Sequence, residues 1–235
     1  MNFSHHPPPR WNEVTAIFGG RFDPPHLGHR EAVRGLFNYP GVKQVWVIPC
    51  GSPPHKPTRV SAENRLAMAR INFSAAQNNP FPRDVKIETL ELERALLNPN
   101  QPSYTYDTLT QLRPHFPHLA CVIGADQLDQ LFTWHRFPEL LAQSHWIILE
   151  RKPQGSEIAR RTLQEWEASG LVRPMHSNLW QITGANVFLH LVPTDAMPLC
   201  STQIRETLSR TGTPPQDALL PEIDGYLKTH QLYGI

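Results

Sequence analysis

Short apolar runs separated by helical patterns restrict the fold of this chain more than any other feature of its sequence. We interpret the runs as buried strands and the segments between them as helices. The expected strands are 14–18, 45–48, 85–92, 120–123, 146–149 and 187–192, and the expected helices are 27–37, 61–78, 104–112, 201–209 and 223–230. Strands that alternate with helices form a parallel sheet covered on both faces. We therefore predict an α/β fold, doubly wound and mostly parallel, with a small C-terminal helical part.

Length and composition suit one globular domain. The chain has 235 residues, of which 40% are hydrophobic and 18% charged, enough for a sizeable core. We expect a single domain over 14–235 after a flexible N-terminal tail over 1–13, where proline and histidine are concentrated. The formal net charge is +1, so no overall basic field favours nucleic acid as a partner.

The cysteines and the hydropathy pattern indicate a cytoplasmic protein. Cys50, Cys121 and Cys200 lie far apart and are odd in number, which is typical of free thiols in a reducing compartment. Their spacing does not suit a structural zinc site. The N-terminus lacks an apolar signal core, and runs such as VWVIP are too short to span a bilayer. We therefore expect no membrane partner.

The loops that follow the expected strands are the places to look for a ligand. In open parallel sheets, ligands bind beyond the carboxyl ends of the strands, where the strand order reverses. Four segments qualify, at 19–28, 49–56, 124–126 and just before 201. The first of them contains the most residues that could bind or activate a ligand.

This first loop reads GGRFDPPHLGH over residues 19–29. Gly19 and Gly20 leave the strand without side chains, so a ligand can approach the backbone closely. A helix that starts behind the two prolines points its first amides outward. His26 and His29 share one face of that helix, and Gly28 leaves room above it. Together these features favour an anion site that suits a polyphosphate.

Other interpretations of this loop stay open. Either histidine could be structural, the glycine pair could form only a turn, and Asp23 could be a loop or cap residue. Two histidines at this spacing could also bind a metal, although further ligands would be needed and HExxH is absent. No GxGxxG follows the first strand, which weakens an oxidoreductase interpretation.

Two motifs give the chain a family resemblance. GGRFDPPHLGH resembles the GG(S/T)FDPxHxGH signature of nucleotidyltransferases with an HxGH motif, and CSTQIRE over 200–206 resembles their second signature, (S)STxIR. Between them, PPHK at 53–56, SYTYDTL at 103–109, IGADQLDQLFTW at 123–134 and ERKP at 150–153 are similar to segments of bacterial nicotinate-nucleotide adenylyltransferases. The closing LYGI resembles that family's LY ending. A Rossmann-like nucleotidyltransferase fold is what the resemblance implies.

The resemblance also implies a reaction in NAD biosynthesis. The 5′-phosphate of nicotinate mononucleotide would attack the α-phosphorus of ATP, and pyrophosphate would leave. Catalysis would consist of alignment and charge stabilisation. His26 would contact the α-phosphate, His29 the leaving phosphates, and Arg205 the other end of the triphosphate. Mg²⁺ would be held by the ATP phosphates and water, so no residue is assigned as a metal ligand.

Further binding residues follow from the same motifs. The expected ATP-binding residues are Gly19, Gly20, Phe22, Gly28, Lys56, Gly124, Asp126, Ser201 and Thr202, with Ser201 also expected as a helix N-cap. The expected mononucleotide-binding residues are Arg21, Thr105, Trp134 and Arg151, with Trp134 stacked on the pyridine ring. Without the resemblance, packing or surface roles suit Lys56, Asp126, Trp134 and Arg205 about as well.

The sequence departs from the family pattern at three places. Arg21 stands where the family usually has serine or threonine, and Cys200 replaces the first serine of the second signature. The segment 154–185 is longer than in compact members, and we interpret it as a surface insertion rather than a lid or a subunit contact. Three alternatives remain: another HxGH enzyme such as a phosphopantetheine adenylyltransferase or a cytidylyltransferase, a non-catalytic nucleotide-binding regulator, and a metal-dependent hydrolase. A homo-oligomer is possible.

Overall fold

The computed structural model describes residues 13–39, 41–54, 57–74, 81, 84–151, 154–197 and 199–235, with the backbone alone at 151 and 154–156. Apart from Glu13, the predicted N-terminal tail lies outside the described residues, and so does Lys56. No helix within these ranges is long and apolar enough to cross a membrane.

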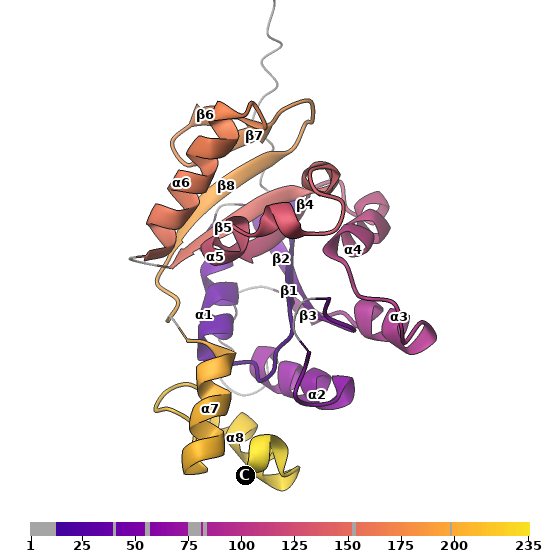
Figure 1. Cartoon of the computed structure of the whole chain (residues 1–235), viewed down its shortest axis with the longest axis vertical. Coiled ribbons are helices and arrows are strands. Elements are labelled where there is room, and N and C mark those ends of the chain that lie inside the picture. Colours follow the sequence, from indigo (N-terminus) through magenta and orange to yellow (C-terminus); the bar gives the residue numbers. More distant parts are fainter. Residues whose placement is uncertain are drawn as a thin grey trace, which may run out of the picture.

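The centre of the protein is an eight-stranded sheet in the order β3-β2-β1-β4-β5-β8-β7-β6 (Figure 1). The first six strands in this order pair in parallel, and β7 and β6 continue the sheet in antiparallel fashion. The strands are β1 Val14–Gly20, β2 Val42–Pro49, β3 Val85–Ile87, β4 Leu119–Gly124, β5 His145–Arg151, β6 Val172–His176, β7 Leu179–Ile182 and β8 Phe188–Thr194. The predicted mostly parallel, doubly wound α/β fold is confirmed.

The strand order reverses between β1 and β4. From β1 the chain moves outward to β2 and β3, then returns to β4 on the other side of β1 and continues to β5 and β8. Open α/β sheets bind ligands in the crevice outside such strand ends, so we expect the ligand crevice at the carboxyl ends of β1 and β4. Gly19 and Gly20 end the first of these strands, and Gly124 ends the second.

Helices cover both faces of the sheet because successive strand residues point to opposite sides. Ala16 and Phe18 of β1 pack with the first two helices, whereas Ile17 packs with helices on the other face. The first pair are α1 Leu27–Leu36 and α2 Ala62–Phe73, and the helices of the opposite face are α4 Thr105–Leu112, α5 Ala125–Leu128 and α6 Gln154–Ala168. Short 3₁₀ turns, Arg113–His115, Leu131–Thr133 and Glu139–Gln143, lie between α4 and β5.

The prediction of a strand over 85–92 is wrong in its second half. Only β3 is extended, and α3 Leu90–Leu97 begins two residues after it. Thr89 caps this helix, Glu91 and Glu93 lie in its first turn, and LELERALL consists of good helix formers. An apolar-polar alternation over so few residues does not separate a strand from the start of an amphipathic helix.

The segment 154–185, which we interpreted as a surface insertion, contains α6, β6 and β7. Ala159, Leu163 and Trp166 of α6 join the core on one face of the sheet. The two strands extend the sheet beyond β8, and the outer strand β6 carries Pro174. The segment thus supplies part of the sheet and core. That compact relatives lack it stays a prediction.

The predicted C-terminal helical part is present and packs against α2. It consists of α7 Ser201–Thr211, α8 Pro221–Thr229 and the 3₁₀ turn Leu232–Gly234. These elements share a third hydrophobic cluster with Met68 of α2, formed by Ile204, Leu208, Ala218, Leu219, Ile223, Leu227 and Leu232. The backbone amide of Leu27 donates to the carbonyl of Ala218 at 2.9 Å. The end of the chain is thereby fixed against the start of α1 (Figure 1).

Candidate active site

The loop after β1 is built around a buried aromatic ring. Phe22 has a left-handed backbone (φ 51°) and its ring lies in the core, near Phe18, Phe73 and His29. A Cβ added to Gly20 would lie 2.8 Å from the Phe22 ring, so this ring requires glycine there. Gly19 is exposed, and nothing lies within 4 Å of the place a Cβ would take. Gly19 therefore offers open backbone, whereas Phe22 can contact a ligand only through its main chain.

The two histidines cap the helix that follows. His26 is the N-cap of α1, and its Nδ1 accepts from the His29 amide at 3.3 Å. In return, His29 Nδ1 accepts from the His26 amide at 3.2 Å. The rings stack with centroids 3.6 Å apart. Because each Nδ1 accepts a backbone hydrogen, the neutral rings carry their proton on Nε2. The helix start thus fixes both the place and the tautomer of the pair.

Gly28 does not leave the open space that we expected. It is buried, and an added Cβ would lie 2.8 Å from the carbonyl oxygen of Met197. The loop that precedes α7 therefore packs directly on α1 here. The glycine is needed for this close approach of two backbone segments, a reason that only the tertiary structure reveals.

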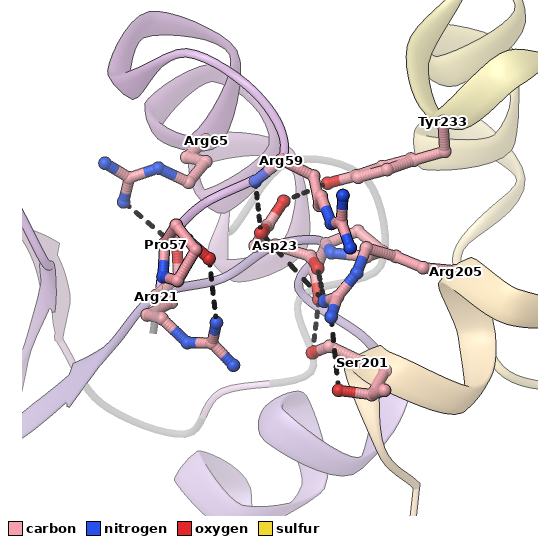
Figure 2. Close-up of polar contacts among 10 residues, drawn as sticks. Arg21, Asp23, Pro57, Arg59, Arg65, Ser201, Arg205 and Tyr233 are labelled. Atoms are coloured by element: carbon pink, nitrogen blue, oxygen red, sulfur yellow. Dashed lines mark hydrogen bonds and ion pairs between the residues drawn. The ribbon is translucent and has the colours of Figure 1, made fainter. Parts of the chain in front are cut away.

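The start of α7 lies against the same loop. Arg205 Nη1 donates to the carbonyl of Asp23 at 2.6 Å, and its Nη2 donates to Thr202 Oγ1 at 3.1 Å. Ser201 Oγ donates to the carbonyl of Pro24 at 2.9 Å. The prediction that Ser201 is the N-cap is wrong, because Cys200 holds that position and Ser201 begins the helix. Its hydroxyl instead joins the two loops (Figure 2).

Asp23 is contacted by several of the surrounding segments. Its side chain is 1% exposed, its Oδ1 accepts from the Tyr233 hydroxyl at 2.7 Å, and its Oδ2 accepts from the Arg59 amide at 2.9 Å. Arg205 Nη1 lies 3.9 Å from Oδ2. A buried carboxylate needs such donors to remain charged. Four segments of the chain therefore meet at one side chain (Figure 2).

Arg65 of α2 joins the loops after β1 and β2. Its guanidinium donates to the carbonyls of Arg21 at 3.1 Å, Cys50 at 2.5 Å and Gly51 at 3.1 Å. Burial lowers the pKa of this guanidinium, which is 1% exposed. The Arg21 side chain itself donates to the carbonyl of Pro57 at 3.4 Å. The two loops are thus held together by backbone acceptors rather than by a ligand.

The other end of the crevice is formed by β4 and aromatic side chains. Gly124 ends β4, and an added Cβ would lie 2.4 Å from Asp126 Oδ1, so the carboxylate folds closely over it. Trp134 is half-buried and packs on the core beyond the turn Leu131–Thr133. Beside it, the exposed His135 stacks on Tyr104 with centroids 4.2 Å apart. Thr105 begins α4 directly after this tyrosine.

Known proteins with a similar sequence identify the family. A family model described as cytidylyltransferase-like matches residues 17–207. A probable nicotinate-nucleotide adenylyltransferase of Pectobacterium atrosepticum is 33% identical over 94% of this chain and 98% of its own length. One from Sodalis glossinidius is 34% identical over 94% and 97%. The chain belongs to the nicotinate-nucleotide adenylyltransferase family. It is therefore a nucleotidyltransferase.

Solved structures show the same fold. A Plasmodium falciparum nicotinic acid mononucleotide adenylyltransferase complexed with NaAD superimposes with a TM-score of 0.69 over 94% of this chain and 97% of that one, at 17% identity. A structure from Vibrio parahaemolyticus, a putative nicotinate-nucleotide adenylyltransferase, gives 0.51 at 18% identity. The Rossmann-like nucleotidyltransferase fold expected from the motifs is therefore confirmed.

This nucleotidyltransferase brings part of the predicted site together. The contacts above link five predicted residues that come from opposite ends of the sequence: His26, His29, Ser201, Thr202 and Arg205. The other predicted residues lie further across the sheet: Gly124 ends β4, Asp126 lies in α5, Thr105 begins α4, and Trp134 follows the turn Leu131–Thr133. Lys56 lies outside the described residues, and Arg151 is described only as the last backbone position of β5.

A cavity of about 380 Å³ lies elsewhere on this protein, between α1 and the end of β8. Glu31, Arg34, Tyr39, Thr194 and Asp195 are among the residues that line it. Its described lining contains none of the predicted site residues. We therefore place the candidate site by the converging loops rather than by this cavity.

Sequence reasoning missed several residues that hold the site. The sequence alone indicates only a loop or cap residue at Asp23, and it assigns no role to Arg59, Arg65 or Tyr233. The motif FDP and the closing LY were visible, but nothing in a single sequence pairs residues 210 positions apart. His135 and Tyr104 were missed for the same reason, although both flank residues that we selected.

Charge and metal chemistry at the site follow from the same contacts. Partial burial raises the pKa of the Cys200 thiol, but hydrogen bonds from the Gln203 and Thr202 backbone outweigh it and lower that pKa overall. Within the described part of the chain, no three His, Cys, Asp or Glu side chains form a cluster that could hold a metal ion. Both Asp23 oxygens already accept hydrogen bonds.

Proposed function

We propose that this nucleotidyltransferase transfers the AMP moiety of ATP to nicotinate mononucleotide, a step of NAD biosynthesis. A 5′-phosphate oxygen of the mononucleotide attacks the α-phosphorus of ATP. The bond from that phosphorus to the bridging oxygen of the β-phosphate breaks, and pyrophosphate leaves. The products are nicotinate adenine dinucleotide and pyrophosphate. The attacking oxygen is already anionic, so no protein nucleophile is required.

One observation carries this proposal. His26 and His29, fixed by reciprocal caps at the start of α1, lie on the same loop that Arg205 contacts through Asp23. Imidazole and guanidinium donors are groups that stabilise charge on a transferring phosphoryl group. Apart from Arg21 and Cys200, the two motifs GGRFDPPHLGH and CSTQIRE match the signatures of the family to which the chain belongs.

In the proposed complex each group has a defined task. His26 stabilises charge on the α-phosphate, and His29 binds the leaving phosphates. The Leu27 and His29 amides at the start of α1 do not contribute, because they already donate to the Ala218 carbonyl and to His26 Nδ1. Arg205, Ser201 and Thr202 bind the other end of the triphosphate, with Lys56 as a further cation. The nucleotide is bordered by Gly19, Gly20, the Phe22 backbone, Gly124 and Asp126. Gly28 acts indirectly, by letting the loop before α7 pack on α1. Mg²⁺ bound to the phosphate oxygens of ATP neutralises part of their charge.

The acceptor is proposed to bind at the aromatic end. Trp134 stacks on the pyridine ring, Thr105 lies beside it, and Arg151 and Arg21 supply positive charge. Two neighbours support this assignment, because Tyr104 and His135 already stack in that region. The Plasmodium falciparum relative was solved in complex with NaAD, the product of the same reaction. Its likeness to this chain supports a dinucleotide-sized crevice.

The decisive experiment offers Mg-ATP with a panel of acceptors. Nicotinate mononucleotide, nicotinamide mononucleotide and phosphopantetheine are each added, and the dinucleotide or adenylylated product and pyrophosphate are measured. We expect nicotinate adenine dinucleotide to form fastest. A second arm replaces ATP with CTP. Preferred transfer to phosphopantetheine, preferred use of CTP, or ATP consumption without any acceptor would each reject the proposal in favour of a different enzyme.

The proposal places the reaction in the cytoplasm. Cys50, Cys121 and Cys200 are all free thiols, which suits a reducing compartment. Homo-oligomer formation stays a prediction, which the mass of the purified protein in solution can test.

A further inference from the structure

The last residues of the chain reach into the loop that carries the histidines. Tyr233 lies in the final turn, Leu232–Gly234, and its hydroxyl donates to Asp23 Oδ1 at 2.7 Å. Gln231 and Tyr233 both have left-handed backbones, with φ of 51° and 58°. A left-handed conformation costs free energy in residues other than glycine, so the surrounding contacts must hold the turn in place. Figure 2 shows the phenol directed at the carboxylate.

The phenol is a permanent donor in this contact. Burial, the hydrogen bond to Asp23 and the charge of Asp23 raise the pKa of the Tyr233 hydroxyl. It therefore keeps its proton across the physiological pH range. Its acceptor is 1% exposed, so water cannot easily replace the phenol as a donor.

The two oxygens of Asp23 are divided between two donors. Oδ1 accepts from Tyr233, and Oδ2 accepts from the Arg59 amide. Arg205 instead uses the backbone carbonyl of Asp23 and lies 3.9 Å from Oδ2, which is too far for a hydrogen bond. The backbone carbonyl of Asp23 thus fixes the guanidinium, and the carboxylate does not enclose it in a bidentate pair, the arrangement that arginine and carboxylate otherwise favour.

From this geometry we propose that Tyr233 is a positioning residue for the triphosphate site. By occupying Asp23 Oδ1, it keeps the carboxylate from pairing fully with Arg205. The guanidinium then remains directed at bound phosphate. Without the phenol, Asp23 turns toward Arg205 and competes with ATP for it. This inference rests on the proposed function, since it takes Arg205 as a phosphate-binding group.

The proposal separates two possible roles of the final turn. A turn that only anchors the C-terminal helices would affect stability and leave both substrates equally well bound. If Tyr233 positions the site, its loss should weaken the binding of ATP and leave the binding of the mononucleotide unchanged. Arg205 and the histidine loop are proposed to contact ATP and not the mononucleotide. The variant Tyr233→Phe distinguishes these cases, as it keeps the ring and the turn and removes only the hydroxyl.

A matched control lies in the same helical part. Tyr226 of α8 also donates a hydroxyl hydrogen bond, but its acceptor is Asn64 Oδ1 of α2, at 2.9 Å, and not a group of the histidine loop. Tyr226→Phe therefore removes an equivalent group at a place that does not touch Asp23. We expect its kinetic constants to match the unmodified enzyme.

The test uses the full chain and two readouts. The first is the dissociation constant of an ATP analogue with a methylene group between the α- and β-phosphates. The second is steady-state kinetics with each substrate varied in turn. For Tyr233→Phe we expect ATP-analogue affinity and kcat/KM for ATP to fall about tenfold, the scale of one hydrogen bond to a charged group. The KM for the mononucleotide should change less than about twofold.

A second pair of variants tests the route of the effect. If Tyr233 acts through Asp23 on Arg205, then Tyr233→Phe should lower ATP-analogue affinity much less in an Arg205→Gln background than alone. Equal losses in both backgrounds would overturn the proposal. So would an unchanged ATP-analogue affinity in Tyr233→Phe, or a loss that Tyr226→Phe shares. The melting temperature of each variant is measured first. All titrations are then made at a temperature at which every variant is folded.

Failure of the proposed function gives a different result. If the unmodified enzyme adenylylates another acceptor or none, the assignment of nicotinate mononucleotide is wrong, yet the ATP-analogue titrations still compare Tyr233→Phe with Tyr226→Phe. If the unmodified enzyme makes the expected dinucleotide and the titrations agree for all variants, only the positioning role fails.

Discussion

The two ends of the crevice are held in different ways. At the end near β1, buried charges and backbone groups fix the loops: Asp23 joins four segments, and Arg65 donates to three carbonyls. At the end near α4, the side chains are partly exposed and meet through aromatic faces, with His135 on Tyr104 and Arg136 over Tyr106. One end is a rigid polar frame, and the other is an aromatic surface.

This difference matches the demands of the proposed chemistry. Charge redistributes on the triphosphate during transfer, and groups that stabilise it must already be in place. A pyridine ring keeps its structure, so stacking alone can hold it, and small shifts are tolerated. We therefore expect changes at the polar frame to lower turnover and changes at the aromatic end to weaken acceptor binding.

The largest effect should come from His26. His26→Ala removes both the imidazole and the cap of α1, and we expect kcat to fall by roughly 100-fold or more, the scale for a preorganised transition-state donor. His26→Asn is the control, because asparagine is a good N-cap and restores the helix start without the ring. Steady-state kinetics of both variants should show the same loss. Near-normal turnover of a folded His26→Asn protein would contradict the assigned role. It would also mean that the two ends of the site do not differ in their effect on turnover.

The aromatic end should respond in the opposite way. Trp134→Ala should raise KM for nicotinate mononucleotide about tenfold, since stacking on an aromatic side chain is worth about 1–3 kcal/mol per base. The KM for ATP and the melting temperature should change much less. Trp134→Phe keeps a ring and should recover most of the affinity. Equal increases in both Michaelis constants would mean that Trp134 is a packing residue and not a ring partner.

A smaller effect is expected between the two ends, at Glu91. Burial raises the pKa of this carboxyl, which accepts from Thr108 Oγ1 at 2.7 Å. Between its ordinary value of 4.5 and the raised one, the folded protein binds more protons than the unfolded chain. The contribution of Glu91 to stability is therefore complete below the unfolded pKa and declines as the pH rises.

Glu91→Gln removes this pH dependence, because glutamine does not titrate. Relative to the unmodified protein, its melting temperature should increase by a few degrees more at pH 8 than at pH 5. Melting curves over that range check the expectation. A constant difference at all pH values would show that Glu91 is as well solvated in the fold as in the unfolded chain.

The smallest kinetic effect is expected at Cys200. This exposed thiol holds the N-cap position of α7, and sulfur is a weaker acceptor than a hydroxyl oxygen for the Thr202 and Gln203 amides that face it. Cys200→Ser supplies a preferred cap and should raise stability by up to about 1 kcal/mol, with kcat within about twofold. A large loss of turnover would show that the polar frame depends on the thiol itself.

Alkylation of the unmodified protein gives a second check on this cysteine. The pKa of Cys200 is lowered, whereas burial raises that of Cys121 to about 12 and that of Cys50 still further. Iodoacetamide should therefore modify Cys200 first, as read by mass spectrometry. ATP should slow this reaction if the start of α7 binds phosphate. Faster labelling of either buried cysteine would contradict the ranking.

The sequence was sufficient to predict the parallel sheet and the positions of its loops. Buried strands such as 120–123 leave a clear local signal, and motif residues at strand ends must meet at one edge of the sheet. The sequence did not predict α3, because a short alternation of apolar and polar residues is compatible with a strand and with the start of a helix. The strands in 154–185 were also missed, since neither alternates: four of the five residues of β6 are exposed and all four residues of β7 are buried.

The polar frame could be predicted only in part. The glycines and histidines of the first motif could be predicted as site residues, because their chemistry suits phosphate binding. Asp23 could not, since a carboxylate beside a triphosphate is unfavourable until its buried donors are known. Tyr233 and Arg65 act through contacts between distant segments, and those contacts are set by the packing of the last helices on α2. The close approach behind Gly28 has the same origin.

The outer strand β6 also determines where lateral growth of the sheet stops. Pro174 has no amide hydrogen to offer, and the neighbouring residues from Arg173 to His176 are exposed. A strand of this kind is a poor template for another chain, which protects the protein from joining edge to edge with its copies. Replacing that proline with a β-branched residue would give concentrated samples a new route to aggregation, far from any group that touches a nucleotide.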